Sequence, residues 1–194
     1  MQNHFYAMMS RMKNIYRWGL MRNTRGENLS EHSLEVAQIA HALAIINRER
    51  FSGNANPSFT ACAAMYHDSS EIITGDMPTP IKYYNSEIKS AYKQIEKEAQ
   101  RELTQMLPED FRDEFSLIYN PDELTKRLIK AADKISALIK CTEELNMGNR
   151  EFLVAEKTIR QAITDMNCQE ANAFLEEFLP SFSLSLDEQR KIEK

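Results

Sequence analysis

The sequence predicts an all-α fold, organised as a single-domain helical bundle over residues 1–194. Apolar residues recur at helical spacing almost everywhere, and no alternating strand pattern of useful length is present. A chain of 194 residues with 42% apolar and 27% charged residues fits one globular domain that buries a continuous core. Neither an internal repeat nor a low-complexity segment divides it.

The N-terminal elements lead into a long helix. An amphipathic segment comes first, with the apolar stripe Phe5, Met8, Met12 and Ile15. A loop over Gly19–Leu29 follows, and the sequence Asn28-Leu-Ser-Glu31 is typical of a capped helix start. The next stripe consists of His32, Val36, Ile39, Leu43 and Ile46. His32 therefore stands at the top of a buried face.

A third helix and a stiff turn come next. After the loop Ser52–Pro57, with Asn56 as the expected cap, a helical stretch over Thr60–Glu71 contains the dipeptide His67-Asp68. One face of this stretch is formed by Thr60, Ala64, His67 and Glu71. The segment Thr74–Pro80 then has one glycine and two prolines, which rule out a regular helix and favour an ordered turn.

The remaining periodic segments complete the bundle. One helix has the stripe Ile88, Tyr92, Ile95, Ala99 and Leu103 and ends at Pro108, and the next runs from Asn120-Pro121 to Gly148. Two C-terminal stripes consist of Phe152, Ala155, Ile159 and Ile163, and of Ala171, Phe174, Leu175 and Phe178. We expect core helices over about 28–148, terminal helices packed around them, and an irregular tail over 181–194.

Four residues form a candidate metal site: His32, His67, Asp68 and Asp133. Imidazole nitrogen and carboxylate oxygen together suit a divalent transition ion, and two of each leave coordination positions open for water or substrate. Two of these residues have a simpler explanation. A histidine such as His32 is often a hydrogen-bonded core residue, and Asp133 could pair with Lys130 or Lys134 at the surface.

Two further acidic residues are candidates for proton transfer. Glu71 lies one helical turn beyond His67, close enough to act on a metal-bound water without binding the ion. The alternative interpretation is that Glu71 is an ordinary glutamate on the helix surface. Asp76, in the stiff turn with Thr79, could bind sugar hydroxyls or protonate a leaving group, or both side chains could simply satisfy backbone groups of the turn.

The charge pattern points to a phosphate rather than to a nucleic acid polymer. The net charge is −5, but residues 1–26 carry five cationic side chains and no carboxylate. Arg17 is followed by Trp18, a pair that could hold a phosphoryl group and provide a flat wall for a sugar or base. A solvated basic face and core filling by Trp18 are the alternatives.

The chain shows no signal peptide or apolar segment long enough for a membrane span, and its three cysteines are dispersed. We therefore expect a cytoplasmic protein without a membrane partner.

These residues resemble the HD-domain metal-dependent phosphohydrolases, whose pattern is His…His-Asp…Asp, and most closely the bacterial 5′-deoxynucleotidase branch. The motifs in that branch's order are Arg17-Trp18, Glu31-His-Ser33, Tyr66-His-Asp-Ser-Ser-Glu71, Thr74-Gly-Asp-Met-Pro-Thr-Pro80 and Ala132-Asp133, with a similar tail at Pro180–Asp187. The resemblance covers nearly the whole chain. Met77 replaces an expected leucine, a mild apolar change.

The resemblance implies an HD-type bundle that hydrolyses deoxyribonucleoside 5′-monophosphates, with little dependence on the base and selectivity against ribonucleotides. It assigns one divalent ion, such as cobalt or manganese, to His32, His67, Asp68 and Asp133. It makes Glu71 the proton handler, with Asp76 as a further candidate acid. It places Arg17 and Trp18 at the phosphate and sugar, and Asp76, Met77, Pro78 and Thr79 along the sugar side. It also implies a homodimer.

Two other functions stay open on sequence grounds. Another HD phosphohydrolase, acting on a cyclic nucleotide or a guanosine alarmone, would keep the same ion and need a different pocket. A non-catalytic HD bundle used for partner binding is the second alternative.

Overall fold

The computed structural model describes residues 3–82 and 84–190. Its long helices are α2 (Leu29–Arg50), α6 (Ser86–Gln105), α8 (Glu123–Asn146), α9 (Leu153–Asp165) and α10 (Gln169–Phe178). Its shorter helices are α1 (Phe5–Met9), α3 (Pro57–Met65), α4 (Glu71–Thr74), α5 (Thr79–Lys82), α7 (Arg112–Tyr119) and α11 (Leu186–Gln189). Short 3-10 helices cover Ser10–Asn14, Glu109–Phe111, Arg150–Phe152 and Leu179–Ser183.

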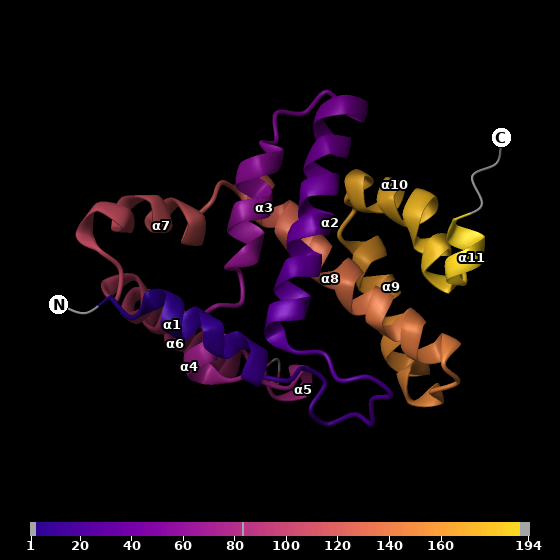
Figure 1. Ribbon diagram of the computed structural model, residues 1–194, viewed down its shortest axis with the longest axis horizontal. Helices are drawn as coiled ribbons and strands as arrows, with labels where there is room; N and C mark the ends of the chain where they lie inside the picture. The colour runs from indigo at the N-terminus through magenta and orange to yellow at the C-terminus, as the bar shows by residue number, and fades with distance from the viewer. Residues whose placement is uncertain (1–2, 83, 191–194) are drawn as a thin grey trace.

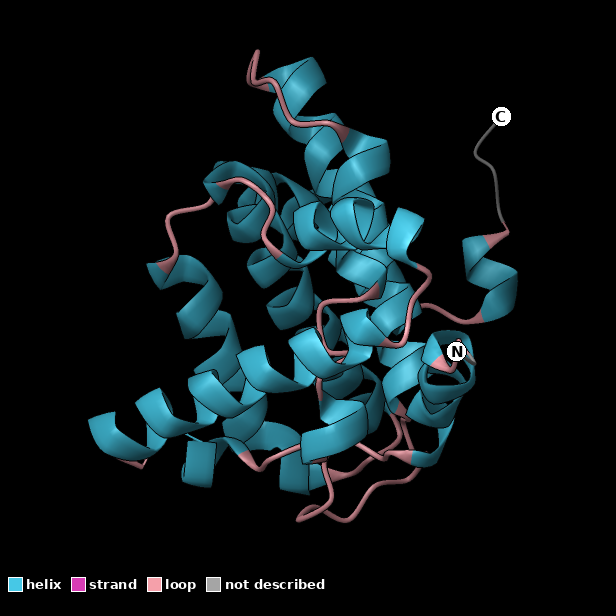
Figure 2. Ribbon diagram, turned by 90° about the vertical axis from the view of Figure 1, so that its left-hand side faces the viewer, coloured by secondary structure: helices cyan, strands magenta, loops and turns pink. Residues whose placement is uncertain are grey.

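The predicted all-α class is confirmed. Every regular element in the described part of the chain is helical, and the one extended feature there is an isolated bridge between Tyr16 and Asn28 (Figure 2). Across residues 3–82 and 84–190, none of the helices combines the length and the apolar character needed to cross a bilayer.

The larger of two hydrophobic cores lies where α2, α3 and α8 cross at the centre of the molecule, with α9 and α10 on one side (Figure 1). Its fully buried side chains include Val36, Leu43, Leu128, Ile135 and Ile163. Complete burial of such a side chain contributes roughly 1.5–3 kcal/mol. This core fixes the relative positions of α2, α3 and α8, the three helices that border the site.

The second core joins α1, α6 and α7 and packs beneath α3. It contains Phe5, Leu103, Leu107, Phe115 and Ile118. The rings of Phe5 and Phe115 meet edge to face at a centroid separation of 4.7 Å. Because α1 is held in this way, the loop that follows it is directed toward the start of α2.

The predicted helix caps are confirmed. The Asn28 side chain accepts hydrogen bonds from the backbone amides of Ser30 and Glu31, and the Glu31 side chain accepts one from the Asn28 amide. Asn56 caps α3, with Pro57 in its first turn. Such caps satisfy amides that have no partner within the helix.

The sequence prediction of one helix through His67 and Asp68 is wrong. Helix α3 ends at Met65, and residues 66–70 form a tight turn before α4. The backbone amides of Tyr66, Ser69 and Glu71 each bond to the carbonyl three residues earlier, as in a series of overlapping turns. Neighbours in a regular helix point about 100° apart, so the turn allows His67 and Asp68 to face the same point.

The C-terminal tail is more regular than predicted. Helix α11 occupies part of the stretch expected to be irregular, because Ser185 and Glu188 form a capping box at its start. Helix α7 was not foreseen either, since the prediction left the stretch between Pro108 and Asn120 without an element. Residues 191–194 of the predicted tail lie outside the described residues.

Candidate metal and phosphate site

The four predicted metal ligands lie together at the crossing of three elements. His32 comes from the first turn of α2, His67 and Asp68 from the turn between α3 and α4, and Asp133 from the middle of α8. Each offers one ligand atom, and these four atoms lie within 4.8 Å of one another. Residues up to 101 positions apart in the sequence therefore share one site.

Hydrogen bonds fix both histidines with Nε2 toward the cluster. Nδ1 of His67 donates to the carbonyl oxygen of Ala64 at 2.8 Å. Nδ1 of His32 lies 3.1 Å from Oγ of Ser136, whose own hydroxyl donates to Glu35 at 2.5 Å. Since the Ser136 hydroxyl proton is already used, its oxygen accepts from His32. Such partners set the tautomer that a metal needs.

The cluster fits a divalent cation. Nε2 of His32 and of His67 is buried without a well-formed hydrogen bond among the described residues, although carboxylate oxygens of Asp133 and Asp68 lie 3.2 and 3.1 Å away. Burial and Arg17 lower the pKa of His32, but the nearby carboxylates of Asp133 and Asp68 raise it well above its usual value. The site therefore attracts positive charge, and its mixed nitrogen and oxygen ligands suit a divalent metal ion.

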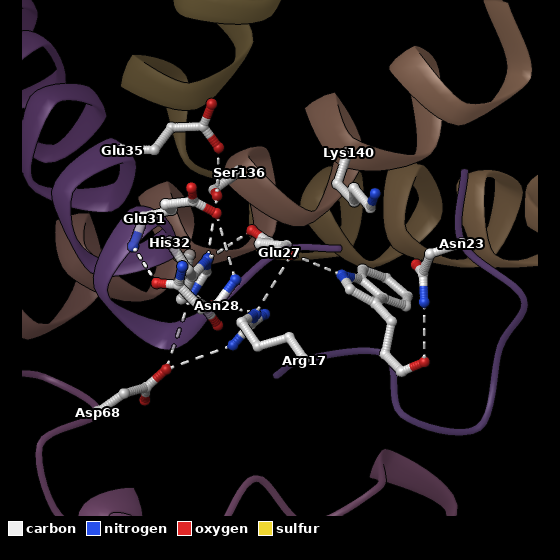
Figure 3. Close-up of polar contacts among 12 residues, drawn as sticks. Arg17, Asn23, Glu27, Asn28, Glu31, His32, Glu35, Asp68, Ser136 and Lys140 are labelled. Atoms are coloured by element: carbon white, nitrogen blue, oxygen red, sulfur yellow. Dashed lines mark hydrogen bonds and ion pairs between the residues drawn. The ribbon is translucent and has the colours of Figure 1, made fainter. Parts of the chain in front are cut away.

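Arg17 lies at the edge of this cluster. Its guanidinium is 3.4 Å from Asp68, 4.0 Å from Asp133 and 3.6 Å from Glu27, as Figure 3 shows for Asp68 and Glu27. The side chain is 13% exposed. Among the described residues, the ion-pair partners of Asp133 are Arg17 and His32. The alternative of a surface pair with Lys130 or Lys134 is therefore wrong.

Trp18 follows Arg17 in a backbone conformation that L-residues avoid. Its φ of 60° lies in the left-handed region, which costs roughly 1–2 kcal/mol. The indole packs against Phe152 at a ring-centroid distance of 5.3 Å, and its Nε1 donates to Glu27 at 2.8 Å. Trp18 is half-buried, so the alternative of simple core filling does not account for the whole residue.

Glu71 is buried, at 5% exposure, and is not the surface glutamate of the alternative reading. Its Oε2 has no hydrogen-bond partner among the described residues. Burial, with repulsion from Asp68 and Asp76, raises the pKa of Glu71 to about 9. A buried carboxyl with a raised pKa beside a metal cluster is characteristic of a proton-transfer group.

Asp76 and its neighbours border the same region with less defined contacts. Burial and repulsion from Asp68 raise the pKa of Asp76, although Arg17 opposes the effect. Met77 and Pro78 are half-buried, and Thr79 is exposed where α5 begins. Within the described residues, no hydrogen bond or ion pair joins residues 77–79 to the four ligands, so their place beside the sugar stays a prediction.

Sequence reasoning missed several polar residues that support the site. On α8, Asp133, Ser136, Lys140 and Glu144 recur at helical spacing along one face, and that pattern was available as a signal. No spacing pattern marks Glu27, which lies in the loop before α2. A cavity of about 260 Å³ beside His67 and Asp133 is also lined by Tyr119, Lys126 and Lys130. These lysines add positive charge to the lining of the cavity, which suits an anionic substrate.

An all-helical bundle that brings His, His-Asp and Asp together defines the class of HD-domain proteins. Two solved structures share this fold. An HD-domain phosphohydrolase from Listeria innocua aligns with a TM-score of 0.81 at 23% identity, covering 98% of this chain and 93% of its own. The cyanophage S-2L HD phosphohydrolase bound to dA and one catalytic Zn²⁺ ion aligns with a TM-score of 0.68 at 18% identity, covering 94% and 98%.

The chain belongs to the YfbR-like 5′-deoxynucleotidase family. The family model described as 5′-deoxynucleotidase YfbR-like matches residues 4–182. A 5′-deoxynucleotidase of Erwinia tasmaniensis is 51% identical, and 5′-deoxynucleotidase YfbR of Escherichia coli is 52% identical. Each alignment covers 96% of both chains. The family expected from the sequence motifs is confirmed, and with it the class of hydrolase.

Proposed function

We propose that this protein is a metal-dependent phosphomonoesterase that hydrolyses deoxyribonucleoside 5′-monophosphates to a deoxynucleoside and phosphate. The proposal includes tolerance of the base and selectivity against ribonucleotides. Its main support is the convergence of His32, His67, Asp68 and Asp133 at one point, with Arg17 on their edge. The 5′-deoxynucleotidase activity for which the YfbR relatives are named agrees with it.

The four ligands would hold one divalent ion, cobalt, manganese or a similar metal. When bound, such an ion neutralises phosphoryl charge and lowers the pKa of a bound water. Hydrogen bonds from Nδ1 keep both imidazole rings oriented for this purpose. Arg17 would exchange its contacts with Asp68 and Asp133 for the phosphoryl oxygens, which a guanidinium binds bidentately.

Glu71 would orient the attacking water and accept its proton. This role requires the pKa of Glu71, raised by burial and by the charges of Asp68 and Asp76, to fall when a cation binds beside it. Glu71 is buried close enough to Asp68 and Asp76 to feel their charge, and its Oε2 has no protein partner in the described part of the chain. A positioned carboxyl of this kind contributes roughly 10²–10⁴-fold to a rate. Water exclusion by the buried surroundings strengthens its interaction with the developing charge.

The sugar side would be formed by Trp18 and residues 76–79. The raised pKa of Asp76 supports a role as donor to the leaving 5′-oxygen, and the same carboxyl could instead bind a sugar hydroxyl. The indole of Trp18, fixed against Phe152, would oppose a 2′-hydroxyl. A homodimer, a cytoplasmic location and the absence of a nucleic acid polymer as partner stay predictions from the sequence.

Phosphate release from a substrate panel tests this function. Metal-stripped protein would receive deoxyadenosine or adenosine 5′-monophosphate, each with and without added cobalt or manganese. Metal-dependent release from the deoxy substrate, with little from the ribo substrate, is expected. No release from either substrate in the presence of metal would refute the proposal.

A further inference from the structure

The loop between the 3-10 helix Ser10–Asn14 and α2 folds back on itself and brings Glu27 beside Arg17 and Trp18. The Leu29 amide donates to the Ile15 carbonyl at 2.9 Å, and the Arg17 amide donates to the Glu27 carbonyl at 2.9 Å. Both bonds join the two limbs of the loop, so Glu27 lies opposite the residues proposed to bind phosphate and sugar.

The Glu27 carboxylate reaches three residues of the site. Its Oε2 accepts a hydrogen bond of 2.8 Å from Nε1 of Trp18 and lies 3.6 Å from Nε of Arg17. Its Oε1 lies 3.5 Å from Nδ1 of His32. The Glu27 side chain is 12% exposed, and Figure 3 shows its contacts with His32 and Arg17 as dashed lines. The Glu27 carboxylate therefore contacts three residues of the site: His32, a proposed metal ligand; Arg17, proposed to bind phosphate; and Trp18, proposed to contact the sugar.

The other contacts of Trp18 hold its backbone and limit the position of its ring, but they do not fix the direction of the indole N–H edge. The carbonyl of Trp18 accepts from the Met21 amide and from Nδ2 of Asn23, which hold the backbone. Phe152 packs on the ring and limits its position. Glu27 is the partner of the polar edge, so it determines which way the indole faces. Trp18 also has a left-handed backbone, and a strained residue of this kind persists where its surroundings hold it.

We propose that Glu27 is a positioning residue that sets the orientation of the Trp18 indole and, through it, the selectivity against a 2′-hydroxyl. Glu27 also orients the Arg17 guanidinium, so it acts on phosphate affinity by a separate contact. The selectivity part of this inference rests on the proposed deoxynucleotidase function. The orientation of Trp18 does not depend on that function and has its own readout.

Two substitutions separate the contacts of Glu27. Glu27→Ala removes the acceptor for the indole and the charge beside Arg17, so both selectivity and substrate affinity should suffer. Glu27→Gln keeps an oxygen that can accept from Nε1 of Trp18 but removes the negative charge. It should retain selectivity while the KM rises through the weakened restraint on Arg17.

The ratio of kcat/KM for deoxyadenosine and adenosine 5′-monophosphate is the first measurement. We expect this ratio to fall about tenfold or more in Glu27→Ala, since loss of a hydrogen bond to a charged group has an effect of that order. Glu27→Gln should stay within about threefold of the unmodified protein. Glu151→Ala is the matched control, because Glu151 holds Arg22 of the same loop without touching Trp18.

Intrinsic fluorescence is the second measurement, because Trp18 is the sole tryptophan of the chain. Glu27→Ala should shift the emission maximum and increase quenching by acrylamide, while Glu27→Gln and Glu151→Ala should resemble the unmodified protein. A folded Glu27→Ala variant with unchanged emission and an unchanged substrate ratio would overturn the inference. If the unmodified protein shows no deoxy preference, the proposed selectivity fails, and the emission shift still decides whether Glu27 positions Trp18.

Discussion

At the scale of single residues, the site gives similar carboxyl groups different chemistry. Burial alone would raise the pKa of Asp68, but the nearby imidazoles of His67 and His32 lower it well below its usual value. Burial and two acidic neighbours instead raise the pKa of Glu71 to about 9. Environments that separate the pKa values of nearby acids divide their roles. Asp68 is suited to bind a cation, and Glu71 to exchange a proton.

Replacement of Glu71 tests this division. In Glu71→Ala, metal binding should be retained, and kcat for deoxyadenosine 5′-monophosphate should fall by roughly 10²–10⁴-fold, the usual contribution of a general acid or base. Metal content after dialysis and phosphate release would be measured on the same sample. Asp133→Asn is the contrasting variant, since it should lose both metal and turnover. Near-normal turnover in Glu71→Ala would remove this residue from the mechanism.

At the scale of elements, periodicity predicted the long helices but not the turn that carries the HD dipeptide. The stripes of α2 and α8 repeat over several turns, and their buried faces agree with the prediction. The stretch around His67 has the composition of a helix, but local backbone bonds close overlapping turns there instead. The Ser69 hydroxyl of this turn also donates to the Tyr119 hydroxyl of α7, a tertiary contact that helical spacing does not predict. The four ligands could be named because each residue type is chemically distinctive. Glu27 could not, since its function comes from loop closure.

The loop that carries Arg17 and Trp18 is anchored to α8 by one buried acid. Glu144, 1% exposed, accepts hydrogen bonds from the amide and hydroxyl of Thr24 and from Asn149, and it pairs with Lys140. Burial alone would raise the pKa of Glu144, but its hydrogen bonds from Lys140, Asn149 and Thr24 lower it to about 2. The anchor therefore depends on the carboxylate being charged.

Acidification should weaken this anchor. A lowered pKa contributes stability that is present above the unfolded value of about 4.3 and is lost as the pH falls toward the folded value of about 2. The stabilisation amounts to roughly 3 kcal/mol, because one pKa unit corresponds to about 1.4 kcal/mol. Urea unfolding would be measured at a series of pH values across this range. The free energy of unfolding of the unmodified protein should exceed that of Glu144→Gln at the upper end, and this difference should disappear as the pH falls.

Glu143→Gln is the control for the acid series, because the Glu143 carboxylate makes no hydrogen bond to this loop within the described residues. As the pH is lowered, the free energy of unfolding of Glu143→Gln should fall by the same amount as that of the unmodified protein. A difference between the unmodified protein and Glu144→Gln that stays constant with pH would contradict the role of the ionised anchor.

At the scale of the whole molecule, the site joins elements that the cores only partly connect. The larger core holds α2, α3 and α8 together, and the second core holds α1, α6 and α7. The turn with His67 and Asp68 leads from α3 into α4, at the border between these two halves. A cation shared by His32, Asp68 and Asp133 would therefore tie this border to both long helices. It would also relieve the repulsion between two carboxylates whose ligand atoms lie within 4.8 Å.

Metal binding should consequently stabilise the entire fold. A ligand that binds the folded state alone, at about 100 times its Kd, adds about 2.7 kcal/mol, which corresponds to a Tm increase of several degrees for a domain of this size. Thermal unfolding of the stripped protein with and without cobalt or manganese would measure it. His41→Gln, on the exposed side of α2, should show the same increase as the unmodified protein, and His32→Ala should show almost none. An equal rise in Tm on metal addition in all three proteins would mean that the stabilising ion binds elsewhere. It would contradict the proposal that the ion at His32 holds these helices together.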